Sequence, residues 1–188
     1  GFPDPTVVRT AFVETDVQGD LSELTVVDYL FQHPMLKDCG VPWVIVGHSE
    51  RRKYYNESDK VVATKIAKAR EAGLGVICCL GETLEQRESG TTMAVVEAQL
   101  AAIKNSISPN AWGDVVVAYE PVWAIGTGKT ATATEAGAMH AALRGLLDEH
   151  LGARGARIPL LYGGSVKPTN AAGLLVPPFI DGFLVGGA

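Results

Sequence analysis

Short apolar runs alternate with longer amphipathic segments over most of this chain. Five runs have the length and composition of buried strands, and most are followed by polar residues or glycine; they cover residues 41–46, 75–80, 115–119, 158–162 and 179–185. Apolar residues at helical spacing predict helices over 59–72, 92–107 and 134–150, with Thr134 available to cap the last of them. Strands that alternate with helices predict an α/β fold with a parallel sheet and right-handed crossovers.

The pattern leaves two architectures open. Five strands suffice for an open sheet, whereas a (β/α)8 barrel needs eight, so the periodicity predicts an open α/β fold or an incomplete barrel. Residues 35–40 resemble the end of a helix stopped by Gly40. Residues 1–34 follow no regular pattern: 6–13 is strand-like, and 21–31 fits a helix or a strand. We therefore expect one domain over 1–188 with an atypical segment at 1–34.

A carboxylate ends the third apolar run. Glu120 follows Tyr119 directly, and Pro121 blocks any continuation of the strand. Residues 121–129 combine a rigid start with a Gly-Thr-Gly sequence, which suits a loop that closes over a small ligand. A nucleotide-binding P-loop is an alternative, but its first glycine would have to stand where this chain has Trp123. An ordinary connection between a strand and a helix is the other alternative.

Composition narrows the range of partners. The net charge is −5 and the isoelectric point is near 5.4, whereas a nucleic-acid surface needs clustered lysine and arginine. Apolar runs stay short of a membrane span, and the N-terminal residues lack a signal-peptide pattern, so we expect a cytoplasmic protein. Three cysteines without metal-ligand spacing argue against disulfides and against zinc; they are Cys39, Cys78 and Cys79.

Several candidate functional groups follow the predicted strands. His48 precedes Ser49 and Glu50, which resemble a first helical turn whose dipole favours a neutral ring. Glu120 is placed for proton abstraction, and the pairs 163–164 and 186–187 are glycines whose backbone N–H groups can approach an anion. Taken singly, these residues fit structural roles, as do Ser165 in a turn, His140 on a packed helix face and His150 at a helix end. Their joint occurrence favours a catalytic site.

The sequence resembles the triosephosphate isomerase family from about residue 35 to residue 188. Five segments carry the resemblance, in the order found in that family: Gly47–Arg52, Cys79–Leu84, Ala118–Lys129, Tyr162–Val166 and Asp181–Ala188. The resemblance implies a (β/α)8 barrel, of which about five C-terminal βα units are recognisable here. It also implies interconversion of dihydroxyacetone phosphate and D-glyceraldehyde 3-phosphate without a cofactor or metal, in glycolysis and gluconeogenesis.

The resemblance further assigns individual residues. Glu120 resembles the general base, His48 the electrophile that polarises the carbonyl group, and Glu50 a supporting carboxylate. Residues 121–129 resemble a mobile lid, and Cys79 resembles a buried structural cysteine. Four residues resemble the backbone donors to the substrate phosphate: Gly126, Ser165, Gly186 and Gly187.

Two features of the family have no recognisable match in this sequence. Residues 1–35 contain no Asn-x-Lys motif, and the loop that docks into a neighbouring subunit of the usual homodimer is not found. An alternative function is therefore a catalytically inactive member that binds a phosphorylated ligand or a partner chain. A Schiff-base aldolase is a poorer fit, because Lys129 and Lys167 do not lie on predicted strands.

Overall fold

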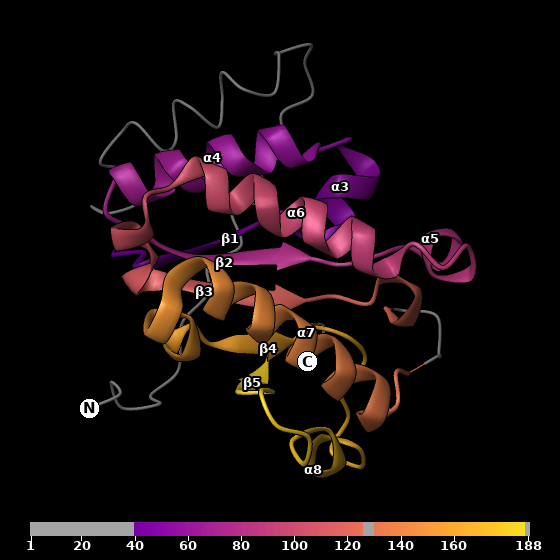
Figure 1. Ribbon diagram of the computed structural model, residues 1–188. Coiled ribbons are helices and arrows are strands. Elements are labelled where there is room, and N and C mark those ends of the chain that lie inside the picture. The colour runs from indigo at the N-terminus through magenta and orange to yellow at the C-terminus, as the bar shows by residue number, and fades with distance from the viewer. Residues whose placement is uncertain (1–39, 126–129, 187–188) are drawn as a thin grey trace.

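The computed structural model describes residues 40–125 and 130–186 and contains a parallel sheet of five strands (Figure 1). The strands are β1 (Trp43–Val46), β2 (Gly75–Leu80), β3 (Val115–Tyr119), β4 (Leu160–Tyr162) and β5 (Gly182–Phe183). They lie side by side in the order of the sequence, and every neighbouring pair is parallel. This order has no switch point, as expected for an arc of a barrel and not for a doubly wound open sheet. The prediction of a partial (β/α)8 barrel is thus confirmed.

Helices follow each of the first four strands, and the three longest of them lie over one face of the sheet (Figure 1). The α-helices are α3 (Ser49–Tyr54), α4 (Asp59–Glu71), α5 (Leu84–Glu88), α6 (Thr92–Ser106), α7 (Ala133–Leu151) and α8 (Ala171–Leu174). Three 3-10 helices cover Pro109–Asp114, Val122–Ala124 and Gly152–Arg157.

The main core lies between the sheet and these helices. Strand residues that face the helices alternate with residues that face away, so β2 contributes Val76, Cys78 and Leu80 to this core. Ile77 and Cys79 belong to a second, smaller cluster on the opposite face of the sheet. All six residues of β2 are buried, as the apolar run predicts for the interior of a parallel sheet.

The predicted strands and helices are confirmed in type and differ at their ends. The last strand is much shorter than 179–185, because Phe179 has a positive φ of 71° and ladder pairing begins only at Gly182. The cap of α7 is Thr132 and not Thr134: the Thr132 side chain accepts from the N–H of Glu135, whose carboxylate accepts from the N–H of Thr132. Helix α5 was not predicted.

Some predictions lie outside the described part of the chain. They concern the atypical segment 1–34, the helix end before Gly40, and the second part of the predicted lid, residues 126–129. Among the described residues, no helix combines the length and the apolar character needed to cross a membrane.

Candidate active site at the carboxyl ends of the strands

Glu120 lies directly after β3 and is almost completely buried, with 2% of its surface exposed. Its backbone N–H continues the sheet pairing by donating to the carbonyl of Leu80, 2.8 Å away. Its carboxylate leaves the sheet on the side of α3, where the backbone N–H of Ser49 donates to Oε2 at 2.9 Å. The strand end therefore places one buried carboxylate against the first turn of a helix.

His48 meets the same carboxylate. Gly47 has a positive φ of 77° and ends β1, and His48 follows as the N-cap of α3. Its Nε2 lies 3.0 Å from Glu120 Oε1, while its Nδ1 accepts weakly from the N–H of Glu50 at 3.4 Å. An acceptor at Nδ1 and a donor at Nε2 correspond to one tautomer, with the proton on Nε2.

Opposing effects act on the charge of the His48 ring. The pKa of His48 is raised above 6.5, chiefly because its ring donates a hydrogen bond to Glu120. Burial of the ring acts in the opposite direction, and the charges of Glu120 and Glu50 raise the pKa further. The prediction of a neutral ring considered only the dipole of α3, whereas the carboxylate in direct contact favours the charged ring.

The first glycine of the 163–164 pair also lies at this carboxylate. The N–H of Gly163 donates to the carbonyl of Tyr119 at 2.8 Å, which places the residue beside Glu120. A Cβ atom at position 163 would lie 2.9 Å from Cγ of Glu120. The structure thus brings His48, Glu120 and Gly163 together from the ends of β1, β3 and β4.

The other predicted residues lie around this centre. Glu50 reaches the site through its backbone N–H, and its residue surface is exposed. Ser165 is half-buried in the turn after β4, where its carbonyl accepts from the side chain of Asn170. Gly186 is exposed beyond β5. Gly126 and Gly187 lie outside the described residues.

A second buried carboxylate stands next to the site and was given no role by the sequence. Glu82 is fully buried; it accepts from Tyr119 Oη at 3.0 and 3.2 Å and from Trp123 Nε1 at 2.8 Å. Burial and the adjacent Glu82 carboxylate raise the pKa of Tyr119, which keeps its hydroxyl protonated as a donor. Glu82 thus joins the end of β2 to the start of the loop after β3.

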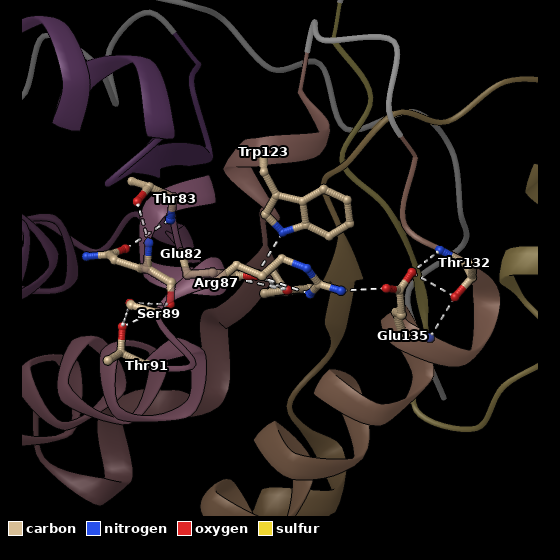
Figure 2. Close-up of polar contacts among 10 residues, drawn as sticks. Glu82, Thr83, Arg87, Ser89, Thr91, Trp123, Thr132 and Glu135 are labelled. Carbon is tan, nitrogen blue, oxygen red and sulfur yellow. Dashed lines mark hydrogen bonds and ion pairs between the residues drawn. The ribbon is translucent and has the colours of Figure 1, made fainter.

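Arg87 extends this network to α7, as Figure 2 shows. Its guanidinium lies over the ring of Trp123, 4.3 Å from the ring centroid, and pairs with the carboxylate of Glu135. Glu135 also accepts from Thr132, which caps α7, and these bonds lower the pKa of Glu135. The spacing of Thr132 and Glu135 is a capping-box signal that was available in the sequence.

Cys78, Cys79 and His140 have structural surroundings. Cys78 and Cys79 are buried as free thiols; burial raises the pKa of Cys78 to about 12 and that of Cys79 well above its ordinary value. His140 is buried against the rings of Tyr119 and Tyr162, and burial lowers its pKa. In the described residues, no group of three or more histidine, cysteine, aspartate or glutamate side chains is arranged to hold a metal ion.

Comparison with known proteins identifies the family. A family model described as triosephosphate isomerase matches residues 31–188. The chain is 54% identical over 155 residues to "Triosephosphate isomerase, glycosomal" of Trypanosoma cruzi, and 52% identical over 156 residues to "Triosephosphate isomerase" of Taenia solium. Each alignment covers 82% of this chain and 62% of the relative, so the chain spans less than two thirds of their length. The chain belongs to the triosephosphate isomerase family.

Proposed function

We propose that the protein interconverts dihydroxyacetone phosphate and D-glyceraldehyde 3-phosphate through an enediolate. The observation that carries the proposal is the 3.0 Å contact between the buried carboxylate of Glu120 and Nε2 of His48. Moving a proton between adjacent carbons requires a base beside the carbon and a hydrogen-bond donor beside the oxygen that gains negative charge. The names of the relatives, triosephosphate isomerase, support the same reaction.

In this proposal Glu120 is the base and His48 is the donor to the carbonyl oxygen. Both oxygens of Glu120 are engaged, one by Ser49 N–H and one by His48 Nε2. A substrate carbonyl that takes over the Nε2–H would release Oε1 and leave the carboxylate free to reach a carbon atom. Glu50 assists by holding Nδ1 of His48 through its backbone N–H. The reaction has no net oxidation or reduction, and the proposal involves no cofactor.

The phosphate group of the substrate would bind to backbone N–H groups. We assign this role to Gly126, Ser165, Gly186 and Gly187, on the basis of the family resemblance. The placement of Gly163 beside Glu120 supports it, because the loop that begins there runs from the base to Ser165. Glycine-rich loops at the ends of late strands are the usual phosphate site of barrel enzymes.

The wider biological setting is also part of the proposal. We place the reaction in glycolysis and gluconeogenesis, in the cytoplasm, and assign residues 1–188 to one barrel domain with an atypical segment at 1–34. One relative is named glycosomal, so localisation of a tagged protein tests the compartment directly. The proposed assembly is a homodimer, which the molecular mass in solution tests.

The activity is tested by measuring interconversion of the two triose phosphates. We expect Glu120→Gln to lower kcat by about 10²- to 10⁴-fold, the range typical of a general base. Glu120→Asp, which retracts the carboxylate by one methylene group, should also lower kcat. Glu85→Gln is the matched control, because Glu85 is exposed on α5. Full rate in Glu120→Gln would remove Glu120 from this role.

The inactive alternative is an outcome of the same assay. No turnover by the wild-type protein, together with measurable affinity for phosphoglycolate, would replace the isomerase proposal with ligand binding alone. Absence of turnover together with absence of affinity would contradict both the isomerase proposal and the ligand-binding alternative.

A further inference from the structure

Gln99 makes an unusual pair of contacts for a residue on the apolar face of a helix. It lies on α6 with 8% of its surface exposed, on the same buried face as Val96, Leu100 and Ile103. Its Oε1 accepts from the backbone N–H of Gly81 at 2.8 Å, and its Nε2 donates to the backbone carbonyl of Gly81 at 3.1 Å. Because one partner can only donate and the other can only accept, the orientation of the amide is fixed.

Gly81 in turn lies directly behind the proposed base. A Cβ atom at position 81 would lie 1.8 Å from the carbonyl oxygen of Glu120, so the two backbones are in direct contact. The residues on either side of Gly81 also bond to this part of the chain: the carbonyl of Leu80 accepts from the N–H of Glu120, and the carbonyl of Glu82 accepts from the N–H of Val122. Residues 80–82 therefore support the backbone from 120 to 122, and Gln99 holds the middle of that support.

This backbone support matters most when the carboxylate is released. In the proposed reaction Glu120 must give up its contact with His48 to reach a carbon atom, and the position of its backbone then decides where the carboxylate lies. A misplacement of about 1 Å at a reacting group can lower a rate by about 10²-fold. An apolar side chain would satisfy the packing of α6 equally well, so packing alone does not account for a glutamine at this position.

We propose that Gln99 is a positioning residue for Glu120, acting through the backbone of Gly81. The proposal rests on the proposed isomerase function for its effect on turnover. Its effect on the geometry of the site does not depend on turnover.

Gln99→Met is the direct test, because methionine has similar length and removes both hydrogen bonds. Gln86→Met is the matched control, because Gln86 also bonds to the backbone of the same loop, but at Thr83 and not at Gly81. Gln99→Glu is the conservative variant, since a protonated carboxyl group can both donate to and accept from Gly81. Thermal unfolding of all three variants measures how much each change affects the fold.

Two readouts separate positioning from simple stabilisation. We expect Gln99→Met to lower kcat by about 10- to 100-fold with KM changed less than about threefold, and Gln99→Glu to recover part of kcat at acidic pH. We also expect the NMR titration midpoint of His48 to fall in Gln99→Met, because a displaced Glu120 carboxylate no longer raises it. Gln86→Met should leave both quantities unchanged.

The outcomes are distinguishable from failure of the proposed function. If the wild-type protein shows no turnover, the isomerase proposal fails, and the His48 titration still tests Gln99. If Gln99→Met folds and has the same His48 midpoint and the same kcat as the wild type, the positioning proposal is wrong and Gln99 is only a structural residue. If Gln99→Met does not fold, Gln99→Glu carries the test, and a wild-type kcat for it at alkaline pH, where its carboxylate is ionised, would contradict the proposal.

Discussion

At the scale of single residues, the contact between Glu120 and His48 sets the charge of the imidazole ring. The hydrogen bond to Glu120 is the largest cause that raises the pKa of His48, and burial opposes it. Glu120→Gln removes the negative charge but keeps an oxygen acceptor. We therefore expect the His48 pKa to fall in this variant, as measured by NMR titration of the ring protons. Glu85→Gln should leave it unchanged.

The same contact predicts a pH dependence of stability. The folded-state pKa of His48 lies above the value of 6.5 expected in the unfolded chain, so protonation stabilises the folded protein. This contribution is fully present below pH 6.5 and is lost as the pH rises through the folded-state pKa. We expect the wild type to exceed Glu120→Gln in free energy of unfolding by more at about pH 6 than at about pH 9, as measured by chemical unfolding. An equal difference at both values would contradict this reasoning.

Phe179 carries backbone strain that a smaller residue would relieve. Its φ is 71°, a conformation that bulky side chains rarely adopt, and 44% of its surface is exposed. Phe179→Asn is expected to stabilise the protein by about 1 kcal/mol, because asparagine tolerates this conformation. Asn56 offers the reverse experiment, since it has a φ of 52° and Asn56→Phe should destabilise by a similar amount. Denaturant unfolding measures both, and a destabilised Phe179→Asn would show that ring contacts outweigh the strain.

At the scale of elements, the sequence predicts most of what builds the site. The apolar runs that end at Val46, Tyr119 and Tyr162 place His48, Glu120 and Gly163 at the same edge of a parallel sheet. What it does not predict are contacts that depend on the tertiary arrangement. The burial of Glu82, the side-chain bonds of Gln99 and the pKa of His48 all arise between residues from different elements. The start of the last strand differs from the prediction because a phenylalanine with positive φ has no sequence signal.

An ion pair connects α7 with the last described strand. Arg144 is buried and pairs with Asp181 at 3.1 Å, and the same Asp181 oxygen accepts from the N–H of Leu160 at 2.8 Å. Asp181→Ala leaves a buried guanidinium and a strand N–H without this acceptor. We expect it to lower the free energy of unfolding by about 2–3 kcal/mol.

The exposed pair of Lys68 and Glu71 on α4 is the control for this prediction. Glu71→Ala should lower the free energy of unfolding by less than about 0.5 kcal/mol, because exposed ion pairs contribute little to stability. If Asp181→Ala and Glu71→Ala lower the free energy of unfolding equally, the pair of Arg144 and Asp181 stabilises the protein no more than an exposed ion pair does.

At the scale of the whole molecule, two thiols report on the integrity of the core. Cys78 and Cys79 are buried in the interior strand β2, and burial raises the pKa of Cys78 to about 12. We expect both to react with a thiol reagent at neutral pH at least about 100-fold more slowly than in denaturant, since the thiolate is the reactive form. Mass spectrometry of the labelled peptides separates these two positions from Cys39. Rapid labelling of Cys79 in the native protein would show that β2 opens easily.

The molecule brings together groups that are far apart in the chain. His48 follows β1 and Glu120 follows β3, yet parallel strands in sequential order carry both to one edge, where their side chains meet. Glu82, Gln99 and Arg87 support this edge from the intervening segment. In the proposed function, this edge of the sheet transfers a proton to and from a carbon atom of the substrate.

Exchange of solvent deuterium into dihydroxyacetone phosphate is the direct test of this proton transfer, because a base that removes a proton from carbon also returns one from the solvent. NMR spectroscopy of the substrate in D2O follows the exchange without depending on product release. We expect deuterium at the hydroxymethyl carbon with the wild-type protein, and an exchange rate lower by about 10²- to 10⁴-fold with Glu120→Gln. Equal exchange by the wild type and Glu120→Gln, or no exchange by the wild type, would contradict it.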